Sequence, residues 1–144
     1  MNNYASLIEE GIDFETYNLQ EEIEKYDGYD PCGYQLLCRI YKPIIEEKTK
    51  GGIILTDTEI SKKAQDAQIT NFVGLVVKIA KAVYEDKERY SLTGKYCKVG
   101  DWVIFKRTYG DTFCYKGLPT ITIDEDRILG VVEDPRSISK ILNN

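Results

Sequence analysis

The chain has 144 residues, 42% of them hydrophobic and 30% charged, which is typical of one globular domain with appended segments. Its formal net charge of −5 argues against a nucleic-acid partner, because such partners are bound by clustered Lys and Arg. The N-terminus has no secretory signal and no apolar run approaches the roughly 18 residues of a membrane span, so we expect a cytoplasmic protein without membrane contact.

Residues 1–30 are predicted to form an acidic N-terminal extension. Apolar residues recur in it at helical spacing, for example Leu19 and Ile23. The many acidic residues are equally typical of a partly disordered tail. A short helix docked on the body and a disordered tail therefore both remain open. Turn residues at 27–31 end this segment.

Residues 34–41 alternate as a β-strand does, with Leu36, Cys38 and Ile40 on one face. The stretch 46–68 that follows contains few apolar residues. Such a stretch buries too little surface to offset the entropy lost on ordering. We therefore expect a long mobile loop at 46–68.

This loop contains three consecutive aliphatic residues behind a pair of glycines. They are Gly51, Gly52, Ile53, Ile54 and Leu55. A β-strand entered through a turn is one interpretation, since Ile favours strands. The polar surroundings favour the other, an arm that presents the aliphatic side chains to a groove on another protein and becomes ordered on binding.

The rest of the chain reads as short strands separated by turn signals. These strands are expected within 71–80, 99–105, 112–115, 118–123 and 127–133. The polar stretch 84–98 is predicted to be a hairpin excursion, and residues 135–144 a C-terminal tail. Short strands at this spacing indicate an all-β protein built as a small barrel.

The residues available for chemistry are few. The chain has no histidine, which is the usual general base and the usual partner of a Ser or Cys nucleophile. No nucleotide-binding or hydrolase motif occurs. The four cysteines form no C-x-x-C pair, so we expect free thiols rather than disulfides or a zinc site. The sequence therefore predicts no catalytic residue, no cofactor and no metal, and a protein that is not an enzyme.

Three motifs together resemble a GroES-type co-chaperonin. Lys-Gly-Gly-Ile-Ile-Leu-Thr begins at Lys50, Val-Gly-Asp-Trp-Val-Ile-Phe begins at Val99, and the last predicted strand runs from Asp126 to Glu133. Each motif alone is weak, but their order and the strands between them are specific. The resemblance covers about 31–134 and implies a GroES-like β-barrel with a mobile loop and a roof hairpin at 84–98.

The resemblance also implies a function. Members form a homo-oligomer, usually a heptamer, that caps a GroEL-type chaperonin in its ATP-bound state and encloses an unfolded client protein. It assigns chaperonin contact to Ile53, Ile54 and Leu55, with Gly51 and Gly52 as the loop hinge. Neighbouring subunits are expected to pair the first barrel strand with the last. The expected interface residues are Leu36, Cys38, Ile40, Ile128, Leu129 and Val131.

Two departures from typical members shape the alternatives. The N-terminal extension and the C-terminal tail are longer than usual, which suits a virus-encoded co-chaperonin acting in the host cytoplasm. A structural or adaptor protein, such as a viral assembly factor that kept the barrel without chaperonin binding, is the main alternative. Alcohol dehydrogenases also contain a GroES-like barrel, but they require zinc ligands and a Rossmann domain that this chain lacks.

Overall fold

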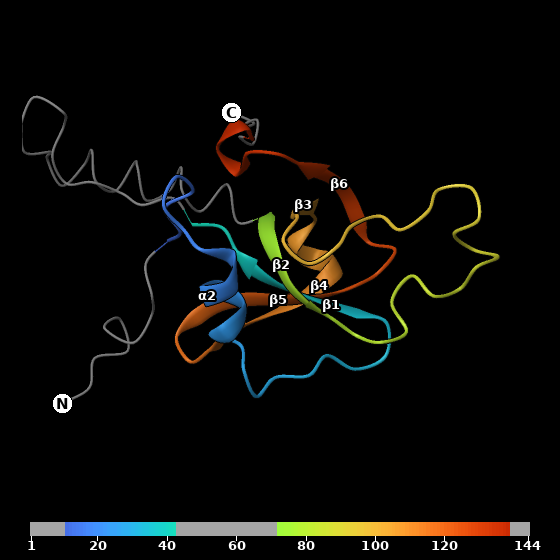
Figure 1. Ribbon diagram of the computed structural model, residues 1–144, viewed down its shortest axis with the longest axis horizontal. Coiled ribbons are helices and arrows are strands. Elements are labelled where there is room, and N and C mark those ends of the chain that lie inside the picture. Colours follow the sequence, from blue (N-terminus) through green and yellow to red (C-terminus); the bar gives the residue numbers. More distant parts are fainter. Residues whose placement is uncertain (1–10, 43–71, 139–144) are drawn as a thin grey trace, which may run out of the picture.

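The structure, a computed structural model, describes residues 11–42 and 72–138 (Figure 1). The predicted loop 46–68 lies outside the described residues. The described elements are α2 (Leu19–Glu24), β1 (Gln35–Ile40), β2 (Val73–Ile79), β3 (Trp102–Phe105), the 3-10 helix η1 (Arg107–Tyr109), β4 (Gly110–Tyr115), β5 (Leu118–Asp124), β6 (Ile128–Val132) and the 3-10 helix η2 (Pro135–Ser137). Within the described part of the chain, no helix is long and apolar enough to cross a membrane.

The six strands form one antiparallel sheet in the order β4-β5-β1-β2-β3-β6. The predicted all-β, GroES-like barrel fold is confirmed. The sheet curls around a common core, because residues from β1, β3, β5 and β6 pack into one cluster. It does not close, since β4 and β6 stand at its two ends.

The sheet is apolar on both faces, which explains why β1 is buried along almost its whole length. The face inside the curl carries the inner cluster: Leu36, Cys38, Ile40, Val76, Ala80, Val83, Tyr84, Tyr90, Cys97, Val103, Phe105, Ile121 and Ile123. The opposite face carries the outer cluster: Ile12, Tyr26, Leu37, Tyr41, Val73, Leu75, Val77, Trp102 and Leu118. The N-terminal extension contributes Ile12 and Tyr26, so it covers the outer face.

Within the extension, α2 begins at a side-chain cap. The Asn18 side chain accepts a hydrogen bond of 3.1 Å from the Glu21 amide, which satisfies one of the free amides of the first turn. Glu21 and Glu22 in that turn also suit the positive end of the helix. Of the two interpretations of this segment, the described residues adopt the docked helix.

The pairing of β1 with β2 contains one irregularity. Leu37 pairs with Lys78 and Cys38 pairs with Val76, so the extra residue is Val77. Gly74 has another role. A Cβ atom there would lie 3.0 Å from both the Arg39 carbonyl oxygen and the Phe105 ring, so close packing requires glycine.

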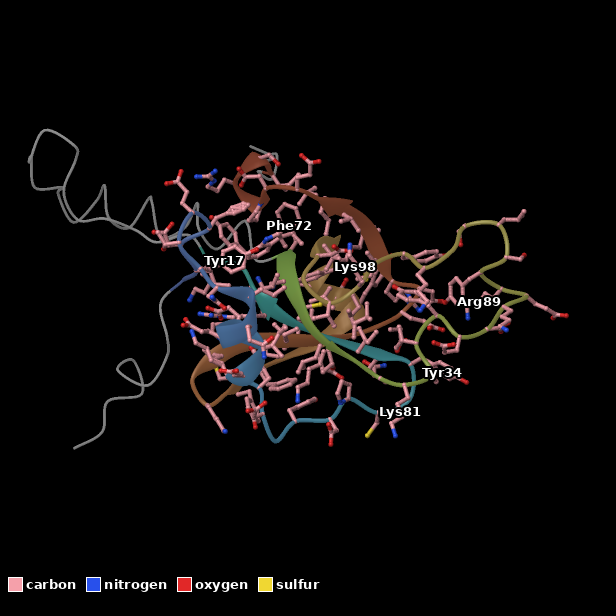
Figure 2. All side chains as sticks on the ribbon, in the orientation of Figure 1. Tyr17, Tyr34, Phe72, Lys81, Arg89 and Lys98 are labelled. Atoms are coloured by element: carbon pink, nitrogen blue, oxygen red, sulfur yellow. The ribbon has the colours of Figure 1, made fainter. Side chains whose placement is uncertain are left out.

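The excursion between β2 and β3 consists of turns and carries no strand, in contrast to the predicted hairpin. Side chains hold it in place of a backbone ladder. The Tyr84 amide donates a hydrogen bond of 2.5 Å to the buried Glu125 carboxylate, and the Tyr84 hydroxyl donates one of 2.7 Å to the Glu125 carbonyl oxygen. The rings of Tyr84, Tyr90 and Tyr96 lie 5.1 to 5.4 Å apart. Figure 2 shows Arg89 of this excursion at the end of the molecule away from Tyr17 and Phe72.

Candidate interaction surfaces

The chain leaves the sheet after β1 and returns to it at β2, the neighbouring strand. The Tyr41 amide donates a hydrogen bond of 2.8 Å to the Val73 carbonyl oxygen, and the Phe105 amide donates one of 2.9 Å to the Phe72 carbonyl oxygen. We call Tyr41, Phe72 and Val73 the root of segment 43–71. Both ends of the segment are therefore fixed to the same region of the sheet.

The residues expected to contact a chaperonin lie within this segment. They are Gly51, Gly52, Ile53, Ile54 and Leu55, all outside the described residues. Their assignment remains a prediction. The structure shows how the segment that contains them is attached. It connects β1 and β2, which are adjacent antiparallel strands.

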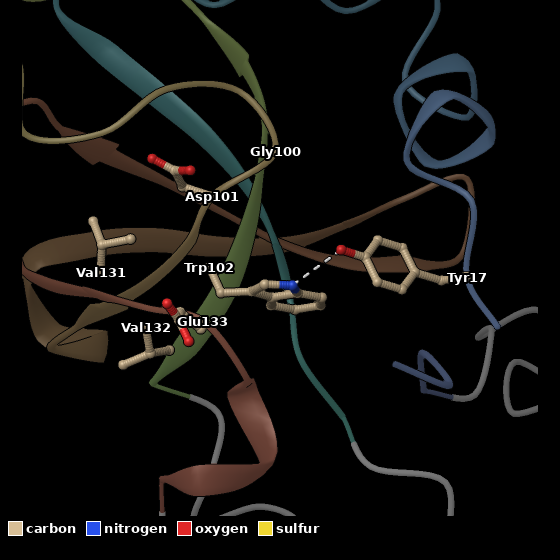
Figure 3. A pocket seen from close by; sticks show the side chains of 7 residues that line it. All are labelled: Tyr17, Gly100, Asp101, Trp102, Val131, Val132 and Glu133. Carbon is tan, nitrogen blue, oxygen red and sulfur yellow. Dashed lines mark hydrogen bonds between the residues drawn. The ribbon is translucent and has the colours of Figure 1, made fainter. Parts of the chain in front are cut away.

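An aromatic cluster covers the root. The Trp102 ring on β3 lies 5.4 Å from the Tyr41 ring, 5.6 Å from the Tyr17 ring and 6.0 Å from the Phe14 ring, in edge-to-face geometry. The indole Nε1–H of Trp102 donates a hydrogen bond of 3.2 Å to the Tyr17 hydroxyl (Figure 3). Phe14 and Tyr17 belong to the N-terminal extension, which therefore reaches the root through Trp102.

The C-terminal turn η2 completes this cluster. The Arg136 guanidinium lies 5.0 Å from the centre of the Phe14 ring and forms ion pairs with Glu15 at 2.9 Å and with Asp134 at 2.8 Å. The hydrogen bonds from Arg136 hold the pKa of Asp134 below its usual value. Burial raises the pKa of Tyr41, and Asp13, Asp134 and Arg136 all act on that hydroxyl. Charged groups of both terminal segments thus act on Tyr41.

Beside the cluster, a shallow hollow of about 320 Å³ opens between the extension and β6. Figure 3 shows the residues that line it: Tyr17, Gly100, Asp101, Trp102, Val131, Val132 and Glu133. Gly100 belongs to the Val-Gly-Asp motif and has φ +98°, a conformation that favours glycine. A Cβ atom there would lie 2.8 Å from a methyl group of Leu19, so the glycine of this motif also leaves room for the first residue of α2.

The remaining part of the extension is anchored by polar groups. The carboxylate of Glu22 pairs with the guanidinium of Arg39 on β1, and both side chains are buried. The Thr120 hydroxyl donates to the Leu118 carbonyl oxygen, so it accepts its 2.6 Å hydrogen bond from the Tyr26 hydroxyl. Further along, the Tyr29 ring stacks on Phe113 at 6.0 Å.

The expected subunit-interface residues divide into two groups. Leu36, Cys38 and Ile40 of β1 lie in the inner cluster, and β1 already pairs with β5 on one side and β2 on the other. Their backbone groups are thus used within the subunit. Ile128 packs against the same inner cluster. The structure brings these four residues together inside one chain.

The other two residues face outward from the sheet's end strand. Leu129 is 60% exposed and Val131 is 47% exposed, and both belong to β6, which among the described strands pairs only with β3. Exposed aliphatic residues on an unpaired edge favour association with another strand. The assignment of these six residues to a subunit interface stays a prediction; the two on β6 are the exposed ones.

Cysteine chemistry is confined to thiols. Cys32, Cys38, Cys97 and Cys114 are all free, as the spacing predicted. Burial raises the pKa of the Cys38 and Cys97 thiols, which disfavours the reactive thiolate. Among the described residues, no group of three or more His, Cys, Asp or Glu side chains is placed to hold a metal ion.

Sequence reasoning missed the contact between the extension and Trp102 beside the root. A signal for it was present, because Leu36 and Leu37 are adjacent in β1 and Val73, Leu75 and Val77 alternate in β2. Adjacent apolar residues in a strand require cover on both faces of the sheet. The aromatic residues Phe14 and Tyr17 were available to supply it.

An open, curled sheet with a long segment inserted between β1 and β2 defines a GroES-like protein. The family model for the Chaperonin 10 Kd subunit matches residues 29–132, and the chain belongs to this family. The recognition from the sequence motifs is thereby confirmed. Residues 11–28, which cover the outer face and the root, precede the matched range.

Curated proteins similar in sequence to this chain are co-chaperonins as well. The chain is 39% identical over 105 residues to the co-chaperonin GroES of Kosmotoga olearia, covering 72% of this chain and 96% of that protein. It is 37% identical over 105 residues to the co-chaperonin GroES of Petrotoga mobilis, with coverage of 72% and 96%. It is 38% identical over 93 residues to the co-chaperonin GroES of Rickettsia bellii, with coverage of 63% and 86%.

Proposed function

We propose that the chain is a co-chaperonin that caps a GroEL-type chaperonin in its ATP-bound state and encloses an unfolded client protein. Membership of the Chaperonin 10 Kd subunit family carries this proposal. The connection of segment 43–71 supports it, because the segment that contains the Gly-Gly-Ile-Ile-Leu motif joins the adjacent strands β1 and β2. In this role the protein acts in the cytoplasm, alongside the chaperonin.

In the proposed complex, Ile53, Ile54 and Leu55 enter an apolar groove on the chaperonin, and Gly51 and Gly52 allow the backbone to adapt. Burying three aliphatic side chains contributes roughly 1.5–3 kcal/mol each. Ordering the segment costs about 2–5 kcal/mol. One contact of this kind is weak and reversible.

A ring of subunits turns weak contacts into a tight cap. We propose a homo-oligomer, heptameric as in the family, whose neighbours meet at the β6 edge through Leu129 and Val131. Once one segment has bound, the others bind at a high effective concentration. Loss of the individual contacts during the ATPase cycle then releases the whole cap.

Sedimentation of the protein alone and with a GroEL-type chaperonin, with and without ATP, tests this proposal. We expect a free oligomer and a larger complex that forms only with nucleotide. A protein that never sediments with the chaperonin would overturn the proposal. It would favour the alternative, a structural or adaptor protein that retains the GroES-like fold.

A further inference from the structure

The N-terminal extension and the C-terminal turn meet at the root of segment 43–71. From the extension, Phe14 and Tyr17 contact Trp102, and Trp102 contacts Tyr41. From the C-terminal turn, Arg136 lies over Phe14 and pairs with Glu15. The root is thus enclosed by two parts of the chain that are distant from each other in sequence.

The burial of the root depends on these contacts. Tyr41 is 4% exposed and Trp102 is 3% exposed, although both lie on the outer face of the sheet. Phe72, Val132 and Ile138 are partly buried against the same cluster. Phe14 and Tyr17 pack edge-to-face against Trp102, so without them this ring would be more exposed to water.

We propose that Phe14, Tyr17 and Arg136 form a clasp that holds the root of segment 43–71 and so positions this segment for its partner. The three residues are positioning residues, because they act on the root through Trp102, whose ring contacts Tyr41. The positioning of the segment for its partner rests on the proposed function. The holding of the root does not, because it concerns contacts within this chain only.

A fixed root lowers the entropy that partner binding must overcome. The two ends of the segment are held at one distance and direction, so fewer conformations are lost when its centre binds. The same effect operates at every subunit of a ring. A small change in root order therefore alters the affinity of the assembled cap by a larger factor.

The test compares three variants of the full chain. Tyr17→Ala removes the ring and the hydrogen bond to Trp102, whereas Tyr17→Phe removes the hydrogen bond only. Tyr29→Ala is the matched control, since it removes a stacked tyrosine from the same extension where it contacts Phe113 and Tyr115. Circular dichroism establishes that each variant keeps the sheet.

Two measurements report on the root without any chaperonin. Trp102 is the chain's one tryptophan, so its fluorescence follows the cluster directly. Hydrogen exchange of the Tyr41 amide, which bonds to the Val73 carbonyl oxygen, follows the closure of the root. We expect Tyr17→Ala to red-shift the emission and to speed this exchange about tenfold or more, with Tyr17→Phe nearer the wild type. Tyr29→Ala should leave the emission near that of the wild type and the exchange rate within about twofold.

The third measurement is the affinity for a GroEL-type chaperonin with ATP. We expect Tyr17→Ala to weaken capping about tenfold or more, and Tyr29→Ala to leave it nearly unchanged. Unchanged fluorescence and exchange in Tyr17→Ala would overturn the clasp. A loosened root with undiminished capping would overturn the positioning role. If the wild type itself failed to bind, the proposed function would fail, and the exchange and fluorescence results would still decide whether the clasp holds the root.

Discussion

The carboxylate of Glu22 in the N-terminal extension pairs with the guanidinium of Arg39 in β1, and both side chains are almost fully shielded from water. Lys25 adds a second contact to the same carboxylate at 3.2 Å. Arg39 lies in the central strand β1, where it is paired with Leu75 of β2 and Thr120 of β5. The extension is therefore an integral part of the fold, because it supplies the counter-charge for an arginine of the sheet.

Glu22→Ala should lower the free energy of unfolding by about 3 kcal/mol, since removing one partner of a buried ion pair leaves a charge in a poorly solvated site. Urea denaturation followed by circular dichroism measures this change. Glu21→Ala is the control, because Glu21 is exposed on the same helix, and its effect should stay within about 0.5 kcal/mol. Equal losses in the two variants would show that α2, and not the ion pair, determines stability.

Tyr26 predicts a loss of stability at alkaline pH. Burial raises the pKa of Tyr26 to about 12, against an ordinary value of 10.0. Between these values the unfolded chain releases the phenol proton while the folded chain retains it, so stability falls as pH rises from about 10 to 12. Below about pH 10 none of this stability is lost, and the full loss above about pH 12 amounts to roughly 2–3 kcal/mol in the free energy of unfolding.

Tyr26→Phe tests this assignment in two ways. Below about pH 9 the variant should be about 1 kcal/mol less stable, because the Thr120 hydroxyl loses its 2.6 Å hydrogen bond. Above pH 10 its stability should decline less steeply than that of the wild type. Parallel pH profiles from urea denaturation would show that other groups cause the alkaline loss.

The exposed edge of β6 predicts where copies of the chain meet. Val131→Lys places a charge on that edge and should dissociate the oligomer while the subunit stays folded. Thr112→Lys is the matched control, because Thr112 is exposed on β4, the opposite end of the sheet. Sedimentation velocity separates the two results. Dissociation by Thr112→Lys alone would move the interface to β4.

Ile54→Asp tests the expected contact of segment 43–71. A carboxylate cannot enter an apolar groove without a large desolvation cost, so we expect capping to be abolished while the oligomer and its circular dichroism stay unchanged. Thr58→Asp, outside the aliphatic triplet in the same segment, is the control and should preserve capping. Capping that survived Ile54→Asp would exclude the triplet as the contact.

The strands were predictable because their signals are local. Alternation in residues 34–41 and the Val-Gly-Asp turn before Trp102 each specify a short element from neighbouring residues. The turn was predictable for a physical reason, since Gly100 has a positive φ and permits the close approach of Leu19. The excursion before it was predicted less well, because side-chain bonds to Glu125 hold it without a backbone ladder.

The neighbours of β1 in the sheet could not be predicted from local signals. Alternation placed Leu36, Cys38 and Ile40 on one face of a strand, which is correct, but it could not show which strands flank β1. Pairing with β2 joins neighbours in the chain, whereas pairing with β5 joins residues more than eighty positions apart. Strand order depends on such distant pairings, and these occupy both sides of β1.

The sequence by itself determined the family, the all-β class and the segment expected to meet a partner, since motifs and periodicity are properties of adjacent residues. Only the tertiary structure decided the place of the extension. Its contacts join Tyr17 to Trp102 and Glu22 to Arg39, across separations that no local pattern records. The physical reason is that a sheet apolar on both faces must be covered on both, and which segment covers the second face is settled by the packing of the whole chain.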